Sequence, residues 1–214
     1  MIITSFKKVR NDIRVTFDDG SVIVIDYRTV FDFGLRVHDE LSQPKMNELK
    51  HHSSLQKCKD SSFRYLSMRL HSIKELKQKL KLKKYDEQII EEVTAKLLQN
   101  NYLNDEKFAE QFIKDKTALK KMGSTKIKIE LLKRGIPKEI IFEKLKIVSN
   151  DESFDNCLQL AQKKINLLRS RSKEIKNEKN KVYSFLLSKG YESETIASVL
   201  NKLFLANSEE NEFY

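Results

Sequence analysis

The fold is decided by three short stretches of the sequence, Leu80-Lys81-Leu82-Lys83-Lys84-Tyr85, Leu131-Leu132-Lys133-Arg134-Gly135-Ile136 and Leu186-Leu187-Ser188-Lys189-Gly190-Tyr191. In each stretch a Leu precedes a bulky apolar residue by five positions, and an Ile follows that bulky residue by five. The bulky residues are 51 and then 55 positions apart. Three copies at such a period indicate an array of helical repeats.

Each copy predicts a unit of three helices, here called A, B and C, with a tight turn between B and C. The units cover roughly residues 54–100, 104–148 and 151–206. Gly135 and Gly190 are expected to end helix B in the left-handed conformation, which glycine adopts without steric cost. Pro137 fits the start of the second helix C, where no backbone N–H is needed.

Capping residues mark the expected helix starts. Ser42 fits an N-cap, with a proline in the first turn that follows. Ser72 and Glu75 have the spacing of a capping box, in which each side chain satisfies a backbone amide of the first turn. Asp86 and Asn104 are expected to cap the helices that come after them.

The N-terminal residues have a different period. Apolar and polar residues alternate in 13–17, and residues 22–25 are all β-branched. Between them lies Asp18-Asp19-Gly20-Ser21, the pattern of a hairpin turn, because glycine accepts the positive φ that this turn needs. Residues 2–9 can add a third strand. Phe31, Phe33 and Leu35 follow the sheet and are expected to bridge it to the helices.

We therefore predict a mainly α fold, with three tandem three-helix repeats in an elongated curved array after a small antiparallel sheet. The predicted parts are a β-hairpin extension (1–41), a linker helix with the first repeat (42–103), the second repeat (104–148), the third repeat (149–206) and an acidic tail (207–214).

Composition bounds the class of protein. Charged residues make up 34% of the 214 residues, and the net charge of +10 points to a polyanionic partner. Cys58 and Cys157 lack metal or redox spacing, which is typical of free thiols in a reducing compartment. The sequence shows no signal-peptide pattern and no apolar run of the ~20 residues that would span a bilayer. We expect a monomer in the cytoplasm, without contact to a membrane.

The positive charge is concentrated at the end of helix A and along helix B, whereas helix C is acidic. Such units can build a basic stripe that follows a polyanion backbone. Lysine outnumbers arginine, which favours contact with a backbone over reading of base edges. The alternative is a solvated face on each helix. The predicted stripe consists of Arg64, Arg69, Lys74, Lys77, Lys81, Lys84, Lys120, Lys121, Lys126, Lys128, Lys133, Arg134, Lys163, Lys164, Arg169 and Arg171.

Aromatic residues accompany these charges. Tyr65, Tyr85, Tyr102 and Tyr183 fall near basic residues and are able to stack on unpaired bases. At helical spacing such residues more often belong to the core, and we favour the core role here.

Catalytic signatures are absent from the sequence. It contains neither a phosphate-binding Gly-x-x-x-x-Gly-Lys loop nor a Gly-x-Gly-x-x-Gly motif. The histidines have no metal-ligand spacing with Cys or carboxylates. We expect no cofactor, no metal and no enzymatic activity; a nuclease site assembled from Asp and Glu of separate helices remains the alternative.

Three segments resemble the RecX family of recombination regulators. They are residues 65–80 (YLSMRLHSIKELKQKL), 101–109 (NYLNDEKFA) and 121–136 (KMGSTKIKIELLKRGI), and the third repeat adds Lys189-Gly190-Tyr191. The family usually has glycine where Lys84 and Asn101 stand. Because lysine tolerates the left-handed conformation poorly, we expect the first B–C turn to differ in detail.

The resemblance implies a modulator of the RecA recombinase without a cofactor or catalysis of its own. Its repeats would lodge in the groove of the RecA–DNA filament, contact single- and double-stranded DNA, and most often inhibit RecA ATPase and recombinase activity in recombination, repair and the SOS response. The alternative is a general nucleic-acid-binding repeat protein without RecA specificity, for which the basic stripe alone suffices.

Overall fold

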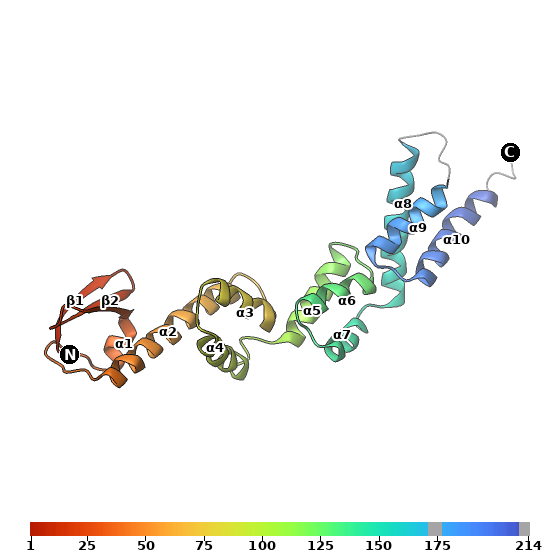
Figure 1. The fold of residues 1–214 in the computed structure, drawn as a ribbon. Helices are drawn as coiled ribbons and strands as arrows, with labels where there is room; N and C mark the ends of the chain where they lie inside the picture. Colours follow the sequence, from red (N-terminus) through yellow and green to blue (C-terminus); the bar gives the residue numbers. More distant parts are fainter. Residues whose placement is uncertain (171–176, 210–214) are drawn as a thin grey trace. The chain divides into compact units, whose positions relative to one another are not determined.

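The computed structural model describes residues 1–170 and 177–209, and of 205–209 only the backbone (Figure 1). The chain divides into two compact units, of which the first ends at Asn104 and the second begins at Asp105. The fold is mainly helical, with three three-helix repeats and a small N-terminal antiparallel sheet, as predicted.

The sheet has three strands in the order β1-β2-β3: β1 (Ile3–Val9), β2 (Asp12–Phe17) and β3 (Val22–Asp26). Gly20 has a φ of +78° in the turn between β2 and β3, and its N–H donates to the Phe17 carbonyl. The predicted hairpin and the third strand are both confirmed. Ile3, Val15, Phe17 and Ile25 are buried on one face of the sheet.

A short helix that the sequence did not predict follows the sheet. It is α1 (Tyr27–Asp32), and the Asp26 carboxylate caps it by accepting from the Arg28 N–H. The helix turns Phe31 outward to 84% exposure, so the expected bridging role of Phe31 was wrong. Phe33 and Leu35 do pack against the core beneath the sheet.

A single helix connects the sheet to the first repeat. α2 (Gln43–Leu66) has 24 residues, and its N-cap Ser42 accepts from the Lys45 N–H as predicted. Met46 and Leu49 pack against the sheet, whereas Cys58 lies in the core of the first repeat. The predicted linker helix and the first helix A are therefore one continuous element.

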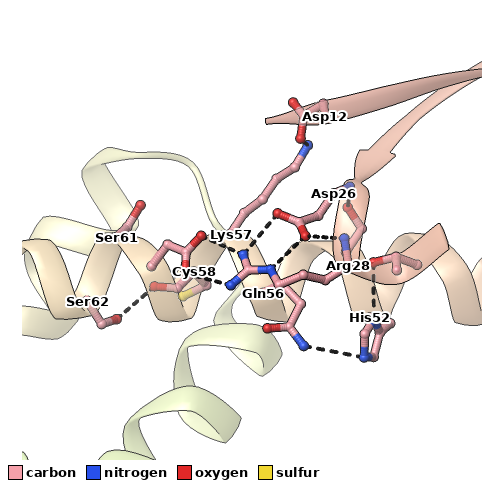
Figure 2. Close-up of polar contacts among 12 residues, drawn as sticks. Asp12, Asp26, Arg28, His52, Gln56, Lys57, Cys58, Ser61 and Ser62 are labelled. Atoms are coloured by element: carbon pink, nitrogen blue, oxygen red, sulfur yellow. Dashed lines mark hydrogen bonds and ion pairs between the residues drawn. The ribbon is translucent and has the colours of Figure 1, made fainter. Parts of the chain in front are cut away.

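A polar cluster fixes the sheet to α2 (Figure 2). Arg28 reaches both the buried Asp26, at 2.8 Å, and Asp60 of α2. The Asp26 N–H donates to Ser53 Oγ at 2.7 Å, and Lys57 Nζ lies 2.9 Å from the Asp12 carboxylate. Burial opposes ionisation of Asp26, but the hydrogen bonds from Arg28 hold its pKa below the ordinary value.

The three repeats share one arrangement of helices A, B and C (Figure 1). The first repeat uses the second half of α2, then α3 (Ile73–Leu82) and α4 (Glu87–Gln99). The second is α5 (Asp105–Ala118), α6 (Ser124–Lys133) and α7 (Lys138–Leu145). The third is α8 (Asn150–Arg169), α9 (Glu178–Lys189) and α10 (Ser193–Glu209). Of the predicted acidic tail, 207–209 are helical and 210–214 lie outside the described residues.

The B–C turns explain the five-residue spacing seen in the sequence. Tyr85, Ile136 and Tyr191 each donate a backbone N–H to the carbonyl of the Leu five positions earlier, at 3.2–3.4 Å. This bond closes the Schellman motif that ends a helix with one left-handed residue. That residue is Gly135 (φ +80°) or Gly190 (φ +91°), and in the first repeat Lys84 (φ +64°). The expectation that the first turn differs was therefore wrong.

Within the second unit, the start of α6 meets the B–C turn of the third repeat. Gly123 N–H donates to the Lys189 carbonyl and Thr125 N–H to the Gly190 carbonyl, at 3.0 and 3.1 Å. A Cβ on Gly123 would lie 2.2 Å from the Gly190 oxygen, so the two backbones touch. The free amides at a helix start are thus satisfied by the free carbonyls at the end of another helix.

Candidate functional site: basic and aromatic residues of the repeats

In the first repeat the predicted basic residues lie on helix B and on both sides of it. Lys74, Lys77 and Lys81 share one face of α3, since they are spaced by three and four positions. Arg64 is in the last turn of α2, Arg69 in the A–B loop and Lys84 in the B–C turn.

In the other repeats the basic residues are placed differently. Lys120 and Lys121 lie in the A–B loop of the second repeat, and Lys126, Lys128 and Lys133 lie on α6, which ends at its C-cap Arg134. In the third repeat Lys163, Lys164 and Arg169 lie on α8, which is a helix A. Arg171 lies outside the described residues.

Several predicted binding residues are paired with carboxylates of their own repeat. Lys77 Nζ lies 2.6 Å from Glu91 and Lys81 Nζ lies 2.5 Å from Glu87, both on α4. Arg69 pairs with Glu75, Arg134 with Glu130 and Arg169 with Glu178. In the first repeat the acidic helix C therefore neutralises part of helix B. The Lys81–Glu87 pair, whose side chains are 53% and 71% exposed, contributes little to stability and opens readily for a polyanion.

Other predicted residues are exposed and uncompensated. Among the residues that the structure describes, no carboxylate lies within ion-pair distance of Lys74, Lys84, Lys120, Lys128, Lys133 or Lys163. The first and second repeats can be aligned in sequence by adding 51 to each residue number, which places Tyr85 on Ile136. In this alignment Arg69 falls on Lys120 and Lys77 falls on Lys128. The basic positions thus recur only in part.

A second pattern recurs in all three repeats and was not predicted. In each repeat one aromatic ring is contacted by two cations, at 4.6–5.3 Å from the ring centroid. Cations at this distance are attracted to the face of a ring. The clusters are Tyr65 with Lys79 and Lys83, Phe112 with Lys116 and Arg134, and Phe185 with Lys164 and Lys189.

These clusters join residues that are far apart in the sequence, so the helical spacing alone could not reveal them. Phe112 and Lys116 are one turn apart on α5, and Phe185 and Lys189 are one turn apart on α9, so these two pairs were local signals. The structure also separates the predicted tyrosines. Tyr85 packs on the first core and bonds to Ser61, Tyr183 packs on the third core, and Tyr102 stays 57% exposed.

The geometry shows neither a metal centre nor a reactive thiol in the described part of the chain. No group of three or more His, Cys, Asp or Glu side chains is placed there to hold a metal ion. Burial raises the pKa of Cys58 to about 11 and that of Cys157 to about 12, which keeps both protonated at neutral pH. None of the helices described is long and apolar enough to cross a membrane.

Comparison with known proteins agrees with this arrangement. Family models for the first, second and third three-helix domains of RecX match residues 58–97, 104–145 and 150–200. The chain is 34% identical to "Regulatory protein RecX" of Clostridium beijerinckii and 33% identical to that of Clostridium botulinum strain Alaska E43, over 92% of each chain.

Solved structures resemble the fold. One, "Crystal structure of regulatory protein RecX", is 18% identical and matches with a TM-score of 0.72 over 92% of this chain and 98% of its own. The structure of RecX from Lactobacillus salivarius is 28% identical, with a TM-score of 0.63 over 71% of this chain and 97% of its own. Three matched domains and relatives of this identity show that the chain belongs to the RecX family of regulatory proteins.

Proposed function

We propose that this protein regulates the RecA recombinase by binding the groove of the RecA–DNA filament, and that it inhibits RecA ATPase and recombinase activity there. The observation that carries the proposal is the cation–aromatic–cation cluster present in every repeat of a RecX family member. It gives the first and third repeats an oriented positive site toward a repetitive, negatively charged partner. In the second repeat both cations also pair with Glu130, which the partner would have to displace.

The clusters favour binding because they order the charges in advance. A free lysine side chain loses ~1.5–2 kcal/mol of conformational entropy when it becomes fixed. Lys79 and Lys83 already rest on Tyr65, so less of this cost remains when they meet a phosphate or a carboxylate. The exposed Lys74 and Lys128 add charge that no described carboxylate compensates.

In this proposal the protein acts by occupying the groove of the RecA–DNA filament. It is a cytoplasmic monomer that needs no cofactor and catalyses no reaction, and it contacts both RecA and the single- or double-stranded DNA of the filament. A repeat set in the groove would block filament growth or promote disassembly, and either lowers ATP hydrolysis by RecA.

The experiment is a RecA ATPase assay on single-stranded DNA with increasing amounts of the protein. The variant Lys74→Glu/Lys77→Glu/Lys81→Glu reverses three charges on one face of α3. A tenfold change in affinity corresponds to ~1.4 kcal/mol of binding free energy. If each of the three lysines contributes a little under half a kcal/mol, the variant should raise the half-inhibitory concentration about tenfold.

The matched control is Lys7→Glu/Lys8→Glu/Lys50→Glu, which makes the same charge change at exposed residues of the sheet and α2. It should inhibit like the unmodified protein. Unchanged inhibition by the α3 variant would exclude the face formed by Lys74, Lys77 and Lys81. The cluster that carries the proposal is tested by Lys79→Glu/Lys83→Glu, and unchanged inhibition by that variant would sink the proposal. If naked DNA binding falls in parallel with inhibition for every variant, the general nucleic-acid-binding function is the better description.

A further inference from the structure

A groove of about 430 Å³ lies between α2 and α4 in the first unit. Leu55, Phe63 and Leu97 supply its apolar walls. Lys59 and Lys96 also line it, and none of the lining residues is acidic, although Glu92 pairs with Lys96 and Asp32 lies 3.6 Å from His52. A groove with apolar walls and cationic groups at its lining suits a ligand that is flat, apolar on its faces and negatively charged.

Tyr102 gives the groove an exposed aromatic wall. The turn after α4 places it there, with Asn101 in the left-handed conformation (φ +56°) and the Tyr102 N–H bonded to the Leu97 carbonyl at 2.9 Å. Its ring meets Phe63 edge to face, with centroids 5.1 Å apart and planes at 87°. The ring is thus fixed on one side while the residue stays 57% exposed.

The charges at the groove are available to a ligand. Lys59 is exposed, and the described part of the chain places no carboxylate at ion-pair distance from it. Lys96 pairs with Glu92 at 2.8 Å, but the two side chains are 62% and 38% exposed, so the pair is weak. Gln56 and Asn100 add amide groups that can hydrogen-bond to the edge of a base.

We infer that this groove binds a nucleotide of single-stranded nucleic acid, with the base against Tyr102 and the phosphates near Lys59 and Lys96. A duplex keeps its bases stacked inside and cannot offer one to the groove. An apolar side chain of a protein partner would fill the groove but would supply no counter-charge to Lys59, which has no carboxylate at ion-pair distance in the described part of the chain. The inference rests on the proposed contact with DNA and deepens it by naming the groove that holds one nucleotide; the binding test is made without RecA, so it can fail separately from the regulation of RecA.

The test uses the full chain and fluorescence anisotropy with a labelled oligothymidylate of about 20 nucleotides, next to a duplex of equal length. Because base–aromatic stacking is lost, Tyr102→Ala should weaken single-strand binding about 5- to 100-fold and duplex binding by less than about twofold. Tyr102→Phe keeps the ring and should bind like the unmodified protein.

Two further variants separate stacking from charge and from folding. Tyr27→Ala removes another exposed tyrosine of the same unit and should leave single-strand binding unchanged. Lys59→Gln should lower the slope of log affinity against log salt by about one, whereas Lys50→Gln on the same helix should not. Thermal melting checks that each variant is folded.

Equal losses on single strand and duplex, or a Tyr102→Phe variant as weak as Tyr102→Ala, would overturn the inference. Competition by thymidine monophosphate as strong as by the oligonucleotide would assign the groove to free nucleotides instead. Since RecA is absent, each of these results leaves the proposed regulation of RecA untouched.

Discussion

Lys84 occupies a left-handed position that the other two repeats fill with glycine. Its φ of +64° costs an L-residue ~1–2 kcal/mol, whereas replacement by glycine raises the entropy of the unfolded chain by an equivalent of ~0.4–1 kcal/mol. Lys84→Gly should therefore raise the free energy of unfolding by up to about 1 kcal/mol, measured by urea denaturation. Gln78→Gly, in the middle of α3, should lower it by about the same amount.

His71 is 3% exposed, and its Nδ1 lies 2.9 Å from the Arg69 carbonyl. Burial lowers its pKa, assisted by the charges of Arg69 and Lys79, while the carbonyl and Glu75 oppose the shift. As the pH falls, His71 therefore becomes protonated at a higher pH in the unfolded chain than in the folded protein. The stability contributed by neutral His71 is complete above the ordinary pKa of 6.5 and is lost as pH falls below it.

A pH series of denaturation curves tests this linkage. The free energy of unfolding should fall as the pH is lowered from about 7 to 5, and His71→Gln should make that dependence shallower. His38→Gln, at an exposed histidine, should retain the dependence of the unmodified protein. Identical slopes for both variants would assign the pH dependence to other groups.

At the scale of elements, Arg28 joins the sheet to α2. Removing it by Arg28→Met leaves the Asp26 carboxylate buried without its partner. Because the Arg28 side chain is itself 29% exposed, we expect the free energy of unfolding to fall by about 2–3 kcal/mol. This is at or below the smallest loss typical of breaking a fully buried pair. Lys57→Met breaks the more open pair with Asp12 and should cost less than about 1 kcal/mol in the same denaturation experiment.

The contact between α6 and the turn at Gly190 gives another prediction at this scale. A Cβ on Gly190 would lie 2.3 Å from the Lys126 Cβ, whereas a Cβ on Gly34 would meet nothing within 4 Å. Both glycines have positive φ, so both alanine variants carry the backbone strain of ~1–2 kcal/mol. Gly190→Ala should lose about 2 kcal/mol more than Gly34→Ala, because only Gly190 is in a close contact. Equal losses of unfolding free energy in the two variants would show that α6 moves away from residue 190 without an energetic cost.

At the scale of the whole molecule, each hydrophobic core belongs to one unit. Two buried clusters lie within residues 1–104 and two within the unit that begins at Asp105. Hydrogen exchange should therefore show that Arg28→Met lowers amide protection in the first unit and Gly190→Ala in the second. Loss of protection across both units from either variant would mean that they unfold together.

The three repeats are recognisable in the sequence because each B–C turn is a local structure. The Schellman turn fixes the distance between Leu80 and Tyr85, so three copies of it disclose three repeats before any packing is known. The hairpin could likewise be predicted from Asp19-Gly20, because the turn depends on adjacent residues and needs the positive φ of Gly20. The short α1 was missed because its cap, Asp26, also ends a strand, and strand and helix signals overlap there.

The candidate site was less accessible to prediction. The basic residues could be named, but the Lys77–Glu91 and Lys81–Glu87 pairs depend on how α3 packs on α4. The contact of the Phe185 ring with Lys164 likewise joins α9 to α8, and no periodicity within one helix encodes it. Charge recurrence showed where cations gather, and the packing decides which of them are free to bind.

The bonds from Gly123 and Thr125 to the turn at Gly190 bear on how the protein is made. Gly123 has no side chain with which to cap α6, so the amides of this helix wait for carbonyls that lie more than 60 residues further along the chain. At ~5–20 residues per second, a ribosome needs roughly 3–13 s to synthesise that stretch. We therefore expect the first turn of α6 to bond to water while the second repeat emerges, and to exchange that water for the carbonyls of Lys189 and Gly190 once the third repeat has emerged.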